Sequence, residues 1–517
     1  MGKRQLLNVL PNLAGVGAGL VFPLLFNIVY YRMLGTEGYG LIGFYGLLAL
    51  IASLMDLGLS QTTLREVARR APNPGRAGEL QSLVLTLAMI SCGLGALVGL
   101  LAIASSKWLA ASWLDLSHLS VEEVATAIAM MGGVAALLFP ANILNAALRG
   151  SQRQVLFNTI AIAAAACRGV ATIAALHVFG ATPLVFFSTQ LLISVCEVAL
   201  LAVVVGCLLP RSASPPRFDF RLFQASWRFT FTLWLSIVIG QLILLSDKVV
   251  MSAVLPLDLF GLYSIAFTVA STVQRLATPF SNAYLPHFVE LVETRSFDPL
   301  SQAYHLASRL ASAVVISAGL LLLIYAQPIM LLLTADAAKA GTIAPVFAML
   351  VAANALAALM VLPQMLQIAC GAPWIALRIN SLQVVPYVAL LVLLAPRIGM
   401  YAPAGLWLAA ASANLPIMTI MTHRIVLQGQ AWGWFKRAIL LPALAAAAVL
   451  GAGAIVAPAP SPVALLPWLA VNYALALAAA LLCAFGGKFP DLGPPRGNVT
   501  NGPATAPPGS PRIPERK

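Results

Sequence analysis

Charged residues are scarce in this 517-residue chain, in which Asp, Glu, Lys and Arg together make up 9% and hydrophobic residues make up 60%. Soluble globular domains carry about 25% charged and about 45–50% apolar residues. The mean hydropathy of +0.91 also indicates a more apolar chain than a soluble domain. The shortage of charge therefore excludes an ordinary soluble fold and predicts a polytopic membrane protein.

Acidic residues are the scarcest charged type, with 17 Asp and Glu against 30 Lys and Arg and a net charge of +13. In a soluble protein such an excess would indicate nucleic-acid binding. In a membrane protein it has a different default meaning, because Lys and Arg accumulate in the cytoplasmic loops. We therefore expect no nucleic-acid partner.

The chain also lacks the patterns of several enzyme classes. Its six cysteines all fall in apolar stretches without disulfide or zinc spacing, and it has no P-loop. The loops between the apolar stretches do not exceed about twenty residues, whereas membrane glycosyltransferases and polymerases generally carry catalytic residues on sizeable loops. We expect a protein that is not an enzyme, with no catalytic residues, cofactor or metal.

Long apolar stretches are abundant. A membrane-spanning helix needs about 20 mostly apolar residues, and fourteen stretches of the sequence meet this length. From about residue 488 the composition changes to Pro, Gly, Asn, Thr and Arg, which predicts a disordered tail over 488–517. The predicted spans are 12–34, 40–61, 80–104, 123–147, 155–177, 181–207, 227–254, 260–285, 308–333, 343–368, 376–395, 402–422, 437–457 and 464–485.

The basic residues predict the orientation of these spans. With the N-terminus inside, the inner loops and both termini collect 23 Lys and Arg, whereas the outer loops hold 4. Shifting the assignment by one helix would invert this asymmetry, which the positive-inside rule forbids. We expect a multi-pass membrane protein with both termini and the tail in the cytoplasm.

An internal repeat shapes the expected architecture. Shifting the chain by 221 residues places Glu37 on Asp258, and the aromatic-Gly-Leu triplet 39–41 on the triplet 260–262. Six predicted helices separate the copies, so the repeat is parallel, with a site expected between two bundles. We predict an all-α fold with one six-helix lobe over 1–210, another over 211–425, and two additional helices over 426–487.

Six ionisable side chains lie inside the predicted spans and away from their ends, where each costs about 2.5–3.5 kcal/mol at a helix centre. Two interpretations stay open, because three are basic and three are acidic. They could form internal ion pairs, such as Arg168 with Glu197, or the basic ones could line a cavity for an anionic substrate. The six residues are Asp56, Arg168, Glu197, Asp247, Lys248 and Arg275.

Residues 241–248 (QLILLSDK) and 259–264 (LFGLYS) resemble the helix 7–8 signature of Wzx-type polysaccharide and O-antigen flippases, in the multidrug/oligosaccharidyl-lipid/polysaccharide (MOP) exporter superfamily. Asp56-Leu57-Gly58-Leu59 is similar to the matching N-terminal motif, and Pro279 and Leu285-Pro286 also fit the family pattern. The resemblance covers roughly residues 5–425. It departs from the lipid II flippase branch, because the first two spans lack interior arginines apart from the terminal Arg32.

The resemblance implies a MATE-like, two-lobed fold that moves undecaprenyl-pyrophosphate-linked sugars, such as an O-antigen or exopolysaccharide repeat unit, outward across the inner membrane. It also implies a cationic cavity for the pyrophosphate-sugar headgroup. We assign Arg168, Lys248 and Arg275 to this cavity, Lys248 by its place in the motif and the two arginines by their depth. Asp56, Glu197 and Asp247 are candidate ion-coupling or structural carboxylates. A polysaccharide polymerase and a chain-length regulator are the expected partners, besides the lipid-linked substrate and the bilayer.

Three alternatives remain from the sequence. A MATE-like multidrug or cation antiporter would share the fold, but cationic drugs favour a net acidic cavity. A membrane-embedded glycosyltransferase or polymerase is disfavoured by the short loops, and a purely scaffolding role in a synthesis complex is disfavoured by the fold.

Overall fold

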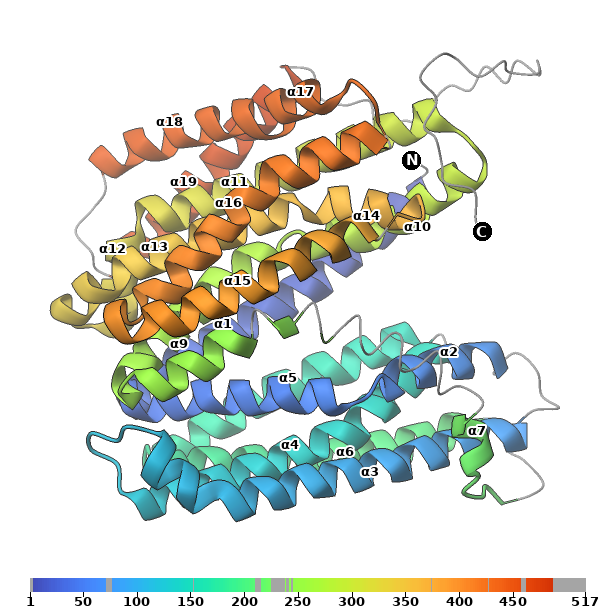
Figure 1. Ribbon diagram of the computed structural model, residues 1–517, viewed down its shortest axis with the longest axis vertical. Helices are drawn as coiled ribbons and strands as arrows, with labels where there is room; N and C mark the ends of the chain where they lie inside the picture. Colours follow the sequence, from blue (N-terminus) through green and yellow to red (C-terminus); the bar gives the residue numbers. More distant parts are fainter. Residues whose placement is uncertain are drawn as a thin grey trace. The chain divides into compact units, whose positions relative to one another are not determined.

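The computed structural model (Figure 1) describes residues 3–70, 77–151, 153–209, 215–224, 238, 241–242, 245–372, 374–425, 427–456 and 462–486. Within these residues the regular elements are helices, together with an isolated β-bridge between Asp115 and Pro256. Twelve helical stretches of the described chain are long and apolar enough to cross a membrane. The predicted all-α membrane fold is confirmed.

The chain forms two compact units. The N-terminal unit comprises Val21–Ile265 with Val392–Gly399, and the C-terminal unit comprises Met1–Leu20, Ala266–Leu391 and Met400–Lys517. The predicted lobe boundary at 210 and the predicted tail 488–517 lie outside the described residues, so the division into lobes stays a prediction.

The helices up to the repeat's second copy are α1 (Lys3–Met55), α2 (Leu59–Arg70), α3 (Ala77–Trp108), η2 (Leu109–Trp113), α4 (Val121–Gly150), α5 (Gln154–Phe179), α6 (Pro183–Leu208), α7 (Phe220–Gln224) and α9 (Leu257–Arg275). In the N-terminal unit α4 packs against α2, α3, α5 and α6, and its buried residues extend from Val124 to Gly150. This central helix holds α5 and α6 in place.

The remaining helices are α10 (Thr278–Glu293), α11 (Phe297–Ile324), α12 (Ala326–Thr334), α13 (Ala337–Leu359), α14 (Val361–Ala369), α15 (Trp374–Ile398), α16 (Tyr401–Ile425), α17 (Ala431–Trp434), η3 (Phe435–Leu440), α18 (Leu441–Ile455) and α19 (Pro462–Phe485). In the C-terminal unit α11 packs against α10, α13, α18, α19 and η3. The two additional C-terminal helices, α18 and α19, also pack on each other.

The first two predicted spans, 12–34 and 40–61, form a single element that is bent at Gly35. This glycine has φ 72° and ψ −175°. Glycine adopts this backbone conformation readily because it has no Cβ, whereas other residues rarely adopt it. The second predicted span ends at Met55 instead of 61, because the chain turns over 56–58 before α2 begins. The predicted span 227–254 lies mostly outside the described residues. This gap and the merging of the first two spans into one stretch together account for twelve stretches instead of fourteen.

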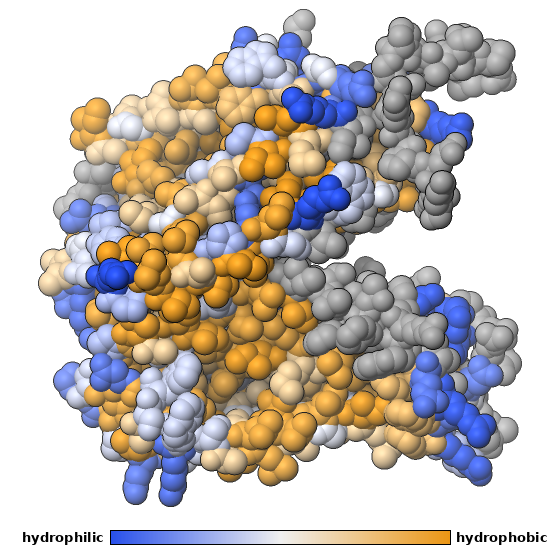
Figure 2. All heavy atoms as spheres, viewed as in Figure 1, coloured by the Kyte–Doolittle hydropathy of each residue, from blue (hydrophilic) through white to orange (hydrophobic). Residues whose placement is uncertain are grey.

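Large apolar side chains cover the outer faces of the helices. Leu100 on α3, Leu192 on α6 and Val385 on α15 are 65%, 65% and 72% exposed. On the face drawn in Figure 2, hydrophobic residues cover the middles of the helices and hydrophilic residues gather toward their ends. Such a continuous apolar surface is unfavourable in water, so these faces contact lipid.

The two copies of the repeat touch each other reciprocally. A Cβ added to Gly40 would collide with the carbonyl oxygen of Leu257, and a Cβ added to Gly261 would collide with the carbonyl oxygen of Thr36. Thr36 and Leu257 are themselves related by the shift of 221, as are Gly40 and Gly261. A contact in which each copy presents the same patch to the other has two-fold symmetry, so the repeat found in the sequence is also present in the structure.

Hydrogen bonds around Glu37, the acidic residue of the first copy, connect three segments of the N-terminal unit. The Glu37 carboxylate is buried and accepts hydrogen bonds from the backbone N–H groups of Ser117 (2.8 Å), His118 (2.9 Å) and Leu119 (3.3 Å). In the loop that contains Ser117, the backbone carbonyl of Asp115 accepts a hydrogen bond from the N–H of Leu257 over 2.9 Å. All three segments were predicted to be outer loops, and the structure brings them to one end of the N-terminal unit.

Candidate functional site

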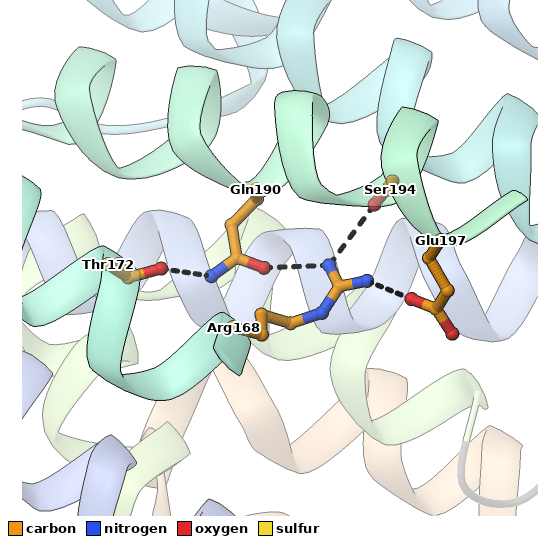
Figure 3. Close-up of polar contacts among 5 residues, drawn as sticks. All are labelled: Arg168, Thr172, Gln190, Ser194 and Glu197. Atoms are coloured by element: carbon orange, nitrogen blue, oxygen red, sulfur yellow. Dashed lines mark hydrogen bonds and ion pairs between the residues drawn. The ribbon is translucent and has the colours of Figure 1, made fainter. Parts of the chain in front are cut away.

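Arg168 is held by a row of polar side chains on the neighbouring helix. It lies on α5, and Gln190, Ser194 and Glu197 follow one face of α6 (Figure 3). One terminal nitrogen of Arg168 donates to Gln190 Oε1 (2.9 Å) and to Ser194 Oγ (3.1 Å), and the other pairs with Glu197 Oε2 (2.6 Å). The Gln190 amide in turn donates to Thr172 Oγ1 over 3.0 Å. The predicted Arg168–Glu197 ion pair is present.

The guanidinium keeps capacity for another ligand. An arginine has five N–H donors, and within the described chain three hydrogen bonds are formed by Arg168. Its side chain is 28% exposed and that of Glu197 is 23% exposed, whereas Gln190 and Ser194 are buried. The protein therefore fixes the guanidinium from the α6 side and leaves part of it accessible to an anion.

Aromatic rings surround this polar group. The Tyr30 hydroxyl donates to the carbonyl of Gly169 over 3.4 Å, and the Tyr30 ring meets that of Phe186 edge-on at 5.0 Å. Tyr45 meets Phe187 at 5.9 Å and lies within electrostatic range of both Arg168 and Glu197. The charged pair thus lies in an apolar setting, where electrostatic attraction is stronger than in water.

Lys248 adjoins the same segment of α1. Its ammonium nitrogen lies 3.4 Å from the position of a Cβ on Gly46, the residue after Tyr45. Its neighbour Asp247 is 1% exposed. Within the N-terminal unit, two of the three predicted cavity cations, Arg168 and Lys248, therefore border the segment 45–46.

The third predicted cation, Arg275, is the exposed last residue of α9 and belongs to the C-terminal unit. It lies at a break in an apolar span, because the chain turns over 276–277 before α10 begins. Arg275 therefore belongs to a different unit from Arg168 and Lys248.

Asp56 has a local structural role. Its carboxylate accepts bonds from the backbone N–H (3.1 Å) and hydroxyl (2.8 Å) of Ser60, at the start of α2. Leu57 and Gly58, with φ 52° and 76°, turn the chain between the two helices. Burial raises the pKa of the Asp56 carboxyl, and the bonds from Ser60 lower it. The carboxylate acts as a helix cap.

Sequence reasoning missed three members of the Arg168 group. Gln190, Ser194 and Thr172 are uncharged and were not singled out. Their signal was spacing, because Gln190, Ser194 and Glu197 recur at helical intervals on an otherwise apolar helix, and Thr172 follows Arg168 by one turn. Among the described residues no group of three or more His, Cys, Asp or Glu could hold a metal ion.

Comparison with known proteins agrees with this fold. The family model described as polysaccharide biosynthesis protein matches residues 6–292, more than half of the chain. No curated protein sequence matches.

Solved structures share the architecture at low identity. The lipid II flippase MurJ in an inward closed conformation is 12% identical with a TM-score of 0.67, over 93% of this chain and 98% of its own. An inward-facing multidrug resistance MATE family transporter of the MOP superfamily is 16% identical with a TM-score of 0.61, over 80% and 95%. A eukaryotic MATE transporter is 12% identical with a TM-score of 0.54, over 84% and 98%. These likenesses show the fold.

Proposed function

The chain belongs to the family of polysaccharide biosynthesis proteins, and from this membership we propose that it is a flippase for undecaprenyl-pyrophosphate-linked oligosaccharides. It acts as a transporter and not as an enzyme, in the bacterial inner membrane with both termini cytoplasmic. Its substrate is the repeat unit of an O-antigen or exopolysaccharide. A polymerase and a chain-length regulator act on the delivered unit.

The observation that carries this proposal is Arg168, which is fixed from one side by α6 and remains 28% exposed. A pyrophosphate cannot cross hydrocarbon without a polar path, because charge is costly there. The planar guanidinium offers a fork that matches a phosphate's oxygens. Lys248, beside the same segment of α1, adds a point charge, and Arg275 supplies a third cation from the C-terminal unit.

Glu197 determines how strongly Arg168 binds an anion. In the absence of substrate it neutralises Arg168. A pyrophosphate that approaches the guanidinium competes with the carboxylate, and protonation of Glu197 would favour the substrate. The pair thereby couples occupancy of the site to a proton, whereas Asp56 stays a helix cap and Asp247 a buried structural carboxylate.

The test is transport of a fluorescent undecaprenyl-pyrophosphate oligosaccharide in proteoliposomes, alongside polysaccharide export in a deletion strain. Arg168→Gln should reduce transport at least tenfold, because the fork is lost, and Arg168→Lys should recover part of it. Arg397→Gln is the matched control, since Arg397 is exposed at the end of α15 and bonds only to the Leu393 carbonyl in the described chain. Full transport by Arg168→Gln and Arg275→Gln would refute the cationic site.

A multidrug or cation antiporter is the second candidate, favoured by the MATE-like fold. It predicts that loss of the gene sensitises cells to cationic compounds and leaves polysaccharide export intact. The basic residues of the site favour an anionic substrate instead.

A further inference from the structure

One face of α11 is tied to the loop that leads into the additional helices. Ser301, His305 and Arg309 are spaced by four residues and lie on the same side of α11. The Ser301 hydroxyl donates to Gln430 Oε1 over 2.7 Å, and His305 Nε2 lies 2.6 Å from the same oxygen. Gln430 directly precedes α17, so these bonds hold the loop against α11.

Stacked rings fix the next residues. The ring of buried Trp434, which ends α17, lies parallel to that of Tyr304 at 6.4 Å and 5.4 Å from that of His423. The π-helical segment η3 begins directly after Trp434 and carries Arg437. Short π-helical segments often occur at functional sites because they redirect side chains. The position of Arg437 relative to α11 is therefore determined by packing.

At this junction α11 and η3 each carry an arginine, and within the described chain neither is paired with a carboxylate. Arg437 lies within electrostatic range of both Arg309 and His305. The Arg309 guanidinium stacks over the ring of Phe485, at the end of α19, with 5.8 Å to the centroid. Its buried Nε has no hydrogen-bond partner, and neither arginine forms an ion pair within the described part of the chain. Like charges held together repel, so the arrangement fits an anion between them.

The surroundings indicate the source of that anion. Trp432 is 69% exposed and stacks on Phe435, as interfacial aromatic residues do. Leu444 on α18 and Leu482 on α19 are 60% and 47% exposed. Both arginines belong to the predicted cytoplasmic end of the helices. We propose that α11, η3 and α19 form a binding site for an anionic phospholipid, with its phosphate between Arg309 and Arg437 and its acyl chains along α18.

This site gives the additional helices a role beyond packing. Arg309 and Arg437 contribute to the positive-inside asymmetry, but that rule needs basic residues only near the cytoplasmic surface and does not require two of them to converge. A phosphate bridged by two guanidinium groups is a strong charge-assisted contact. A basic pocket between helices on the cytoplasmic side suits an anionic headgroup. The proposal is independent of which substrate the protein carries.

The test uses the full-length protein in detergent, titrated with phosphatidylglycerol, phosphatidylcholine or inorganic phosphate, with the Tm and native mass spectra recorded. Phosphatidylglycerol should raise the Tm of the wild type more than phosphatidylcholine does. Arg437→Gln, at an exposed position that does not endanger folding, should weaken phosphatidylglycerol binding by about fivefold. The double variant with Arg309→Gln should lose the preference. Arg378→Gln, which removes an arginine stacked on Trp374 at 5.2 Å, should keep it.

Equal stabilisation of the wild type and Arg437→Gln by phosphatidylglycerol would overturn the site. Stabilisation by inorganic phosphate alone, to the same degree as the lipid, would overturn the lipid as its occupant. Loss of the preference in Arg378→Gln would show a diffuse charge effect and would also overturn it.

Discussion

Gly40 and Gly261 are equivalent residues of the two repeat copies, and each lies against the backbone of the other copy. No side chain fits at either position, because a Cβ on one would meet the carbonyl oxygen of Leu257 and a Cβ on the other that of Thr36. The contact joins α1 beyond its bend to the first turns of α9 within the N-terminal unit. The repeat therefore appears in the structure as a symmetric crossing of two helices.

Replacing either glycine by alanine should destabilise the protein. A backbone carbonyl cannot move aside as a flexible side chain can, so we expect a loss of about 1–3 kcal/mol for Gly40→Ala and for Gly261→Ala. Thermal unfolding in detergent measures it. Gly93→Ala is the matched control, since nothing lies within 4 Å of its Cβ position and alanine favours a helix. An unchanged Tm in both repeat variants would contradict the crossing.

Glu37→Ala should weaken the outer end of the N-terminal unit. The carboxylate is buried and receives backbone N–H groups from three consecutive residues. Hydrogen bonds to a charged group contribute about 1.5–3 kcal/mol each, so the loss should exceed that of a single bond. Hydrogen exchange at residues 117–119 should rise with it. Asp258→Asn provides the repeat-related comparison and should cost less, because Asp258 bonds only to the neighbouring N–H of Leu259 in the described chain.

Variants of the Arg168–Glu197 pair can separate an effect on stability from an effect on transport. Removing either partner leaves a half-buried charge uncompensated and should cost about 1–2 kcal/mol, below the value for a fully buried pair. The double variant Arg168→Gln/Glu197→Gln should regain most of that stability. Under the proposed function it should still fail to transport, because the phosphate-binding fork is missing. Recovery of transport together with stability would assign the pair a purely structural role.

The predicted topology can be tested at two loops. An alkaline phosphatase reporter placed after Leu119 should be active, since this loop is bonded to Glu37 at the predicted outer end. The same reporter after Arg153, in a predicted inner loop that follows α4, should be inactive. Activity at the second site and none at the first would invert the assignment.

A single sequence determined the membrane class and the repeat, because these depend on local apolar length and on residues a fixed distance apart. It also identified Arg168 and Glu197, since a charge in a span is rare. The tertiary structure decided what these residues contact. Gln190, Ser194 and Thr172 complete the Arg168 group only because α5 packs on α6. Arg309 and Arg437 are 128 residues apart in the sequence, and only the packing of α11 with η3 makes them neighbours. Such pairings depend on long-range packing, which the local pattern of a sequence does not encode.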